Sequence, residues 1–185
     1  MALTFVTGPV RSGKTHFAMQ LARASGKNVI YVATAPAYPQ DSEWTQRLRR
    51  HREERPPNWS TIETAVEPRT ELPAVCAARG TADLLLVDSL GTWVADELSR
   101  LDGNRVVERG RETLRALRNA ACSAVVVSEE TGWGIVPQYP AGRIFRDVLG
   151  VLAAEFAHAA GAAYLVVAGY AIDLKQGVPI SAPRS

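Results

Sequence analysis

Residues 8–15, GPVRSGKT, have the residue types and spacing of a loop that binds a nucleoside triphosphate. They match the pattern G-x-x-x-x-G-K-[ST], in which glycines let backbone N–H groups curl around phosphates. Lys14 would reach the β- and γ-phosphates, and the Thr15 hydroxyl would be a ligand of Mg²⁺. An apolar run at 3–7 precedes the motif and a helix-like run follows it, which favours a true P-loop over a ligand-free turn.

Asp88 ends the apolar run DLLLVDS at 83–89. A carboxylate at the carboxyl end of a buried strand can hold the water shell of a bound metal. An aspartate in this position can also simply cap the next helix. Because a P-loop is present, we expect Asp88 to serve the metal or the nucleotide.

The stretch RLRRHREERPP, residues 47–57, places one histidine, His51, among five arginines and two glutamates. On a helix, such residues form i,i+4 ion pairs and the histidine is solvated. A neutral imidazole is also a nucleophile, and guanidinium groups bind phosphates and stabilise charge that develops at phosphorus. The residues alone leave both roles open. Two arginine–glutamate pairs have the i,i+4 spacing: Arg49–Glu53 and Arg50–Glu54.

Short, nearly continuous apolar runs alternate with longer helix-like stretches, which indicates strands buried on both faces of a parallel sheet. The expected strands are 3–7, 28–34, 83–89, 123–129 and 162–169. Two further candidates are a strand at 60–64 and an edge strand at 170–175, which could run antiparallel. The expected helices are 14–25, 41–52, 69–79, 90–100, 104–121 and 143–160. We therefore expect an α/β fold, a three-layer P-loop NTPase sandwich of the RecA-like type, with 1–185 as one domain.

Composition excludes several classes of protein. The 185 residues are 46% hydrophobic and 22% charged, with a net charge of +2, which argues against a nucleic-acid or membrane-surface protein. Cys76 and Cys122 lie in no CxxC or zinc-binding pattern, so we expect reduced, structural thiols. No signal peptide and no apolar run of about 18 residues is present, so we expect a cytoplasmic protein without membrane insertion.

Three further stretches carry a family resemblance: 31–64, 87–96 (VDSLGTWVAD) and 125–150, which contains GWGIVP. Together with the P-loop, they resemble the bifunctional adenosylcobinamide kinase / adenosylcobinamide-phosphate guanylyltransferase of cobalamin assembly. The likeness runs from about residue 3 to 170. It implies that an NTP, ATP or GTP, phosphorylates the aminopropanol hydroxyl of adenosylcobinamide. GTP then gives GMP to that phosphate through a histidine–GMP intermediate, with release of pyrophosphate. It also implies a homotrimer.

The resemblance implies roles for individual residues. His51 falls on the family's nucleophile, and Lys14 is the second expected catalytic residue. Mg²⁺ would be held by Thr15 and Asp88, partly through water. Glu63 matches a carboxylate that contacts the nucleotide and could choose guanine. The expected nucleotide-binding residues are Gly8, Pro9, Val10, Arg11, Ser12, Gly13, Lys14, Thr15, Ala33, Thr34, Ala35, Arg52, Glu53, Glu54, Arg55, Glu63 and Asp88.

The sequence also departs from the family pattern, and the departures remove amides or add negative charge. Glu129 stands where the family has Asn, Gly91 replaces Thr, Asp96 replaces Asn, and Ala153 and Ala154 replace Asn and Gln. These changes leave two other possibilities open. The chain could retain only the kinase or only the guanylyltransferase activity, or it could be a P-loop nucleotide switch or motor.

Overall fold

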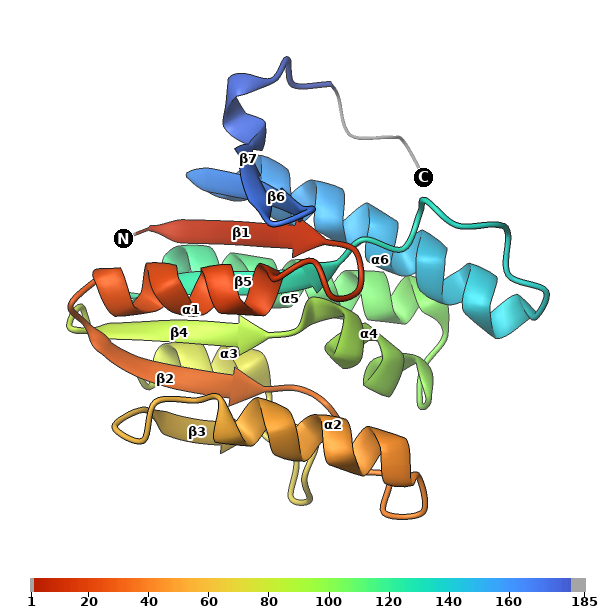
Figure 1. Cartoon of the computed structure of the whole chain (residues 1–185), viewed down its shortest axis with the longest axis horizontal. Helices are drawn as coiled ribbons and strands as arrows, with labels where there is room; N and C mark the ends of the chain where they lie inside the picture. Colours follow the sequence, from red (N-terminus) through yellow and green to blue (C-terminus); the bar gives the residue numbers. More distant parts are fainter. Residues whose placement is uncertain (1, 181–185) are drawn as a thin grey trace.

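The computed structural model describes residues 2–180, in which seven strands form a single sheet (Figure 1). The sheet order is β3-β2-β4-β5-β1-β6-β7, and every pair is parallel except β6–β7. This confirms the α/β sandwich and the antiparallel edge strand. The strands are β1 (Leu3–Gly8), β2 (Asn28–Ala33), β3 (Ser60–Glu63), β4 (Asp83–Asp88), β5 (Ser123–Glu129), β6 (Ala162–Val167) and β7 (Tyr170–Asp173).

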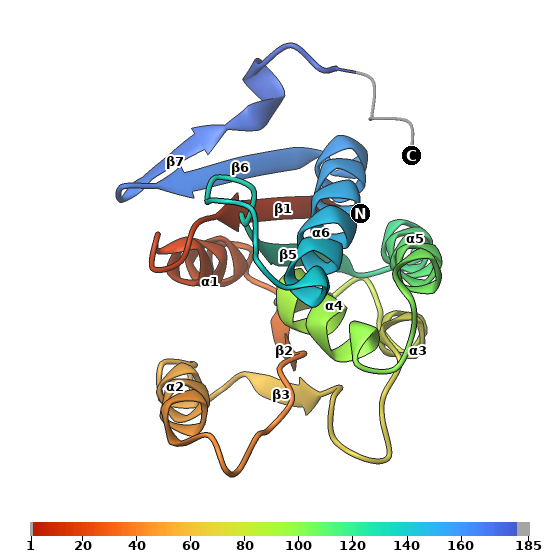
Figure 2. The same ribbon diagram turned by 90° about the vertical axis from the view of Figure 1, so that its right-hand side faces the viewer.

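Helices cover both faces of the sheet, which makes three layers (Figure 2). The larger core lies under α3, α4, α5 and α6, and the smaller core lies under α1. Neighbouring strand residues such as Phe5 and Val6 enter opposite cores, which explains the continuous apolar runs. The helices are α1 (Lys14–Ala24), α2 (Ser42–Glu53), α3 (Leu72–Ala77), α4 (Leu90–Leu98), α5 (Gly103–Asn119) and α6 (Pro140–Ala159), followed by the 3₁₀ turn η1 (Leu174–Gln176).

Two helices begin three residues away from the predicted start, and the other four agree with the prediction to within two residues at each end. The helix expected at 69–79 is shortened to α3, because Pro73 sits in its first turn and Arg69 is used in ion pairs with Glu67 and Asp96. The helix expected at 143–160 begins earlier, at Pro140, since proline is well suited to the first helical position. The strand candidate at 170–175 ends at Asp173, whose side chain caps η1.

Helix α2 is attached to the sheet differently from the others. Asp41 caps it by accepting a hydrogen bond from the Trp44 N–H, yet none of its residues is buried. It lies on the same side of the sheet as α1, beside β3 (Figure 2). Its inner face is therefore available to line a cavity rather than to pack a core.

Both cysteines are free and buried, in agreement with structural thiols. Burial raises the pKa of the Cys76 thiol to about 12, so a reactive thiolate is disfavoured at neutral pH. Among residues 2–180, no helix combines the length and the apolarity that a membrane span requires.

Candidate active site

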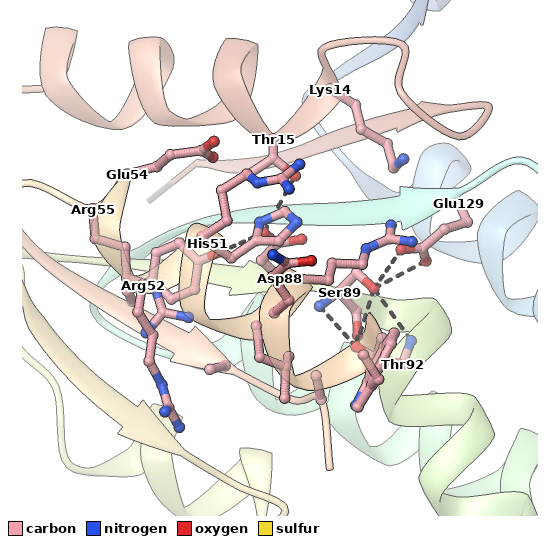
Figure 3. Close-up of a pocket in the computed structure, with 18 of the residues that line it drawn as sticks. Lys14, Thr15, His51, Arg52, Glu54, Arg55, Asp88, Ser89, Thr92 and Glu129 are labelled. Atoms are coloured by element: carbon pink, nitrogen blue, oxygen red, sulfur yellow. Dashed lines mark hydrogen bonds between the residues drawn. The ribbon is translucent and has the colours of Figure 1, made fainter. Parts of the chain in front are cut away.

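A cavity of about 520 Å³ lies at the carboxyl edge of the parallel strands, between the P-loop and α2. This is the edge where open α/β sheets bind their ligands. The ends of β2, β3, β4 and β5 contribute side chains to it. Figure 3 shows His51, Arg52 and Arg55 on one side of this cavity and Lys14 and Glu129 on the other.

The P-loop has the backbone that its glycines allow. A Cβ at Gly8 would overlap the Val166 carbonyl oxygen, so only glycine fits where β1 lies against β6. Gly13 has a φ of 92°, a left-handed conformation that favours glycine, and it caps α1. Lys14 is 7% exposed, and its Nζ donates to the Pro9 carbonyl oxygen at 3.2 Å. The lysine is thus held across its own loop, where a phosphate could replace the carbonyl as its partner.

Thr15 and Asp88 meet at the phosphate end of the cavity. The Thr15 Oγ1 donates to Asp88 Oδ2 at 3.3 Å, and the Tyr31 hydroxyl donates to the same carboxylate oxygen. An alcohol and a carboxylate are ligands that Mg²⁺ accepts. The described residues contain no cluster of three or more metal-ligating side chains. The Thr15 hydroxyl and the Asp88 carboxylate fit Mg²⁺, which takes few protein ligands and binds mainly to phosphates and water.

One face of α2 presents His51 to the cavity. Trp44, Leu48 and His51 are half-buried and follow each other at four and three residues, so they share this face. The Trp44 Nε1 donates to the Pro36 carbonyl oxygen at 2.8 Å, which holds the start of the helix. The histidine therefore lies on the inner side of the helix.

The outer side of α2 carries the solvent-exposed ion pairing that the sequence allowed as one of two roles for this segment. Arg49 and Glu53 form the expected i,i+4 ion pair at 2.8 Å, and both are exposed. Arg50 and Glu54 form no such pair within the described structure, and both line the cavity instead. Only part of the charge of 47–57 thus belongs to a solvent-facing surface.

Arg52 and Arg55 join the end of α2 to the sheet. The Arg52 guanidinium donates to the Glu63 carboxylate at 2.7 Å, which connects α2 to the end of β3. The Arg55 guanidinium carbon lies 4.0 Å from the centre of the Tyr31 ring. Arginines are therefore spread along the cavity wall that contains His51, where they could face a phosphate chain.

Most residues singled out from the sequence line this one cavity. They are Arg11, Ser12, Gly13, Lys14, Thr15, Ala33, Ala35, His51, Arg52, Glu54, Arg55, Glu63 and Asp88. Gly8, Pro9, Val10, Thr34 and Glu53 are not among its lining residues. Thr34 is buried behind the wall, where its Oγ1 donates to the Ser89 carbonyl oxygen at 2.6 Å.

Several lining residues were not singled out for the site by sequence reasoning. Glu129 ends β5, the strand between β1 and β4, and its carboxylate accepts from the Ser89 Oγ at 2.7 Å and from the Gly91 N–H at 3.1 Å. Burial raises the pKa of Glu129, while the hydrogen bond from Ser89 opposes that shift. The sequence feature that could have indicated this role is the position of Glu129 at the carboxyl end of a predicted buried strand. Tyr31, Ser89 and Thr92 also line the cavity.

The other two histidines differ from His51. His16 also lines the cavity, but it is exposed on α1 and contacts Gln20 at 3.1 Å. His158 is exposed on α6 and does not line the cavity. Of the three histidines, His51 is therefore the one that is half-buried in the cavity.

The fold and the cavity define a P-loop NTPase of the RecA-like class, with the phosphate loop after β1 and an aspartate two strands away at the end of β4. A solved ATPase domain has a similar fold, with a TM-score of 0.50, 11% identity, and coverage of 89% of this chain and 68% of that one. Residues 4–174 match the family model described as cobinamide kinase / cobinamide phosphate guanyltransferase, and the chain belongs to this family.

Curated relatives agree with this membership over nearly the full chain. The bifunctional adenosylcobalamin biosynthesis protein CobP of Pseudomonas aeruginosa is 34% identical over 180 residues, covering 95% of this chain and 98% of that protein. CobU of Salmonella typhimurium is 31% identical, covering 94% of this chain and 99% of that protein. The chain is thus a transferase of cobalamin biosynthesis, and nucleoside triphosphates fit both its family and its P-loop.

Proposed function

We propose that this chain carries out both reactions of its family in the one cavity. In the first, the aminopropanol hydroxyl of adenosylcobinamide attacks the γ-phosphorus of ATP or GTP. A new O–P bond forms, the bond to the β-phosphate oxygen breaks, and the nucleoside diphosphate leaves. Lys14 and the P-loop N–H groups would bind the phosphates, and Thr15 and Asp88 would hold Mg²⁺, which would neutralise phosphate charge.

In the second reaction, His51 acts as a nucleophile toward GTP. An imidazole nitrogen forms a bond to the α-phosphorus while the bond to the β-phosphate oxygen breaks and pyrophosphate leaves. The phosphate of adenosylcobinamide phosphate then attacks the same phosphorus and breaks the N–P bond, which gives adenosyl-GDP-cobinamide and restores the histidine. A covalent intermediate divides one difficult displacement into two easier ones. Arg50, Arg52 and Arg55 would stabilise the charge that develops at phosphorus.

The observation that carries this proposal is that His51 and Lys14 line the same cavity although they come from different elements. Unlike the exposed His16, which also lines the cavity, His51 is half-buried there and lies on the wall that contains Arg50, Arg52 and Arg55. We further propose Mg²⁺ as the metal, a cytoplasmic location and 1–185 as one domain, as the sequence predicts, and a homotrimer, as the resemblance implies.

The proposal is tested by following the two products separately. Adenosylcobinamide and γ-labelled ATP or GTP report the first reaction, and adenosylcobinamide phosphate with α-labelled GTP reports the second. His51→Ala should retain the first and lose the second, whereas Lys14→Ala should lose both. His158→Ala, an exposed histidine outside the cavity, is the matched control and should keep both.

Each other outcome has a definite meaning. GMP transfer by His51→Ala at the native rate would contradict the covalent route. If the native protein transferred only the phosphoryl group or only GMP, it would be a family member with a single activity. The departures from the family pattern at Asp96 and Glu129 leave that possibility open.

A further inference from the structure

Tyr31 contacts the phosphate end of the cavity through its hydroxyl. The residue lies on β2, is 2% exposed and lines the cavity. Its O–H donates to Asp88 Oδ2, the oxygen that also accepts from Thr15 Oγ1 at 3.3 Å. Tyr31 therefore fixes one oxygen of the carboxylate that we assign to the metal.

The ring of the same tyrosine contacts the guanylyl-transfer end. The Arg55 guanidinium carbon lies 4.0 Å from the ring centre, and Arg55 follows His51 by four residues. Within residues 2–180, Arg55 has no ion pair; its Nε is buried without a hydrogen-bond partner, and one terminal nitrogen makes a long bond of 3.5 Å to Thr61 Oγ1. The aromatic face is thus a principal contact that holds this guanidinium in place.

Elementary chemistry explains why one tyrosine can serve both ends. A phenol, whose ordinary pKa is about 10, keeps its proton at neutral pH, so the Tyr31 hydroxyl can donate to Asp88 Oδ2. A donor to a metal-binding carboxylate orients it, and loss of such partners typically costs 10- to 100-fold in metal affinity or activity. An arginine over an aromatic face is attracted to the ring by the ring's negative face.

We propose that Tyr31 is a positioning residue shared by both reactions: its hydroxyl orients Asp88, and its ring positions Arg55 beside the His51 helix. This inference rests on the proposed function, because it assigns Asp88 to the metal–triphosphate end and Arg55 to guanylyl transfer. Contacts run from Thr15 through Asp88 and Tyr31 to Arg55 without a gap. Tyr31 therefore contacts residues at both the P-loop end and the His51 end of the cavity.

Tyr31→Phe tests the hydroxyl, because it keeps the ring and removes only the donor. Binding of a fluorescent GTP analogue should require about 10-fold or more Mg²⁺ for half-maximal signal. At saturating Mg²⁺, the rate at which α-labelled GTP modifies His51 should stay near native. Tyr164→Phe removes a hydroxyl from a tyrosine on β6 that does not line the cavity, and it should leave both measurements unchanged.

Tyr31→Leu and Arg55→Ala test the ring. Both should slow modification of His51 on the order of 10-fold at saturating Mg²⁺, and together they should cost little more than either alone. Arg55→Ala should shift the Mg²⁺ titration much less than Tyr31→Phe does, because Arg55 does not contact Asp88. If Tyr31→Leu does not fold by circular dichroism, Arg55→Ala alone decides this half of the proposal.

Three results would overturn the proposal. Tyr31→Phe could titrate with Mg²⁺ like the native protein, Tyr31→Phe could slow modification as much as Tyr31→Leu, or Arg55→Ala could leave modification unchanged. Failure of the proposed function looks different: the native protein would bind the GTP analogue and take up no label. In that case the proposal that the Tyr31 ring positions Arg55 for guanylyl transfer would also be wrong. The Mg²⁺ titration would still test whether the Tyr31 hydroxyl orients Asp88.

Discussion

The Glu129 carboxylate occupies the space that a side chain at position 91 would need. A Cβ built on Gly91 would overlap Glu129 Oε2, and the same oxygen accepts a hydrogen bond from the Gly91 N–H at 3.1 Å. Gly91 replaces a threonine and Glu129 an asparagine of the family pattern. The two positions, which the resemblance marks as departures from the family pattern, are therefore in direct contact at the start of α4.

This pairing predicts strong coupling between the two positions. Gly91→Thr should destabilise the protein by about 1–3 kcal/mol, because it forces the Glu129 carboxylate away from its donors. The double variant Gly91→Thr/Glu129→Asn should recover much of that loss, with a coupling energy on the order of 1 kcal/mol or more. Urea unfolding of the native protein, both single variants and the double variant measures it. Additive free energies would show that the two residues do not share this space.

The raised pKa of Glu129 predicts a pH-dependent contribution to stability. Well below the ordinary carboxyl pKa, the group is protonated in both the folded and unfolded states and contributes nothing. As pH rises past that value, the unfolded state loses the proton first, so the native fold bears the cost of the desolvated charge. Glu129→Gln removes this cost. The stability of Glu129→Gln relative to native protein should therefore be greater at pH 7 than at pH 4.

Chemical unfolding at the two pH values measures that difference, since other titrating groups are common to both proteins. Glu130→Gln, at the next residue, is the matched control, because its carboxylate accepts from the Gly132 N–H in an exposed contact and not from α4. A relative stability of Glu129→Gln that is constant with pH, or that falls as pH rises, would contradict the assignment.

The contact between Arg52 and Glu63 predicts that the Glu63 carboxylate recognises the guanine base of GTP. One oxygen of Glu63 is held by Arg52 at 2.7 Å, and the side chain remains partly exposed in the cavity. A carboxylate held in this way can accept from the guanine N1–H and N2–H₂ groups. Glu63→Gln should weaken GTP binding about 10-fold, as expected for loss of a hydrogen bond to a charged group, and should spare ATP.

Equilibrium binding of the two nucleotides tests this specificity. Glu67→Gln is the control, because Glu67 is an exposed carboxylate that pairs with Arg69 outside the cavity. If GTP and ATP lost binding affinity equally, Glu63 would act by holding Arg52 in place and not by recognising the base.

The P-loop and the buried strands could be predicted because their signals are local. The spacing of Gly8, Gly13 and Lys14 and the continuous apolar runs depend on a few neighbouring residues. The orientation of His51 was less accessible. The charge pattern of 47–57 fits a solvated helix, and only the spacing of Trp44, Leu48 and His51 along α2 indicates an inner face.

The supporting residues could not be found in this way, because their roles depend on partners far along the chain. Tyr31 looks like an ordinary strand residue until β2 lies beside β4 and brings it to Asp88. Glu129 looks like an unfavourable extra charge until the start of α4 presents the Ser89 hydroxyl and the Gly91 N–H to it. Such contacts are decided by the register of the sheet, which no local pattern contains.

The central claim is that His51 becomes covalently attached to GMP. The most direct measurement is to incubate the purified protein with α-labelled GTP and Mg²⁺ and to separate it on a denaturing gel, with His51→Ala and His158→Ala beside it. We expect label on the native protein and on His158→Ala that survives alkali and is lost in acid, as a phosphoramidate requires, and no label on His51→Ala. Absence of label on a native protein that binds GTP, or equal label on His51→Ala, would contradict the claim.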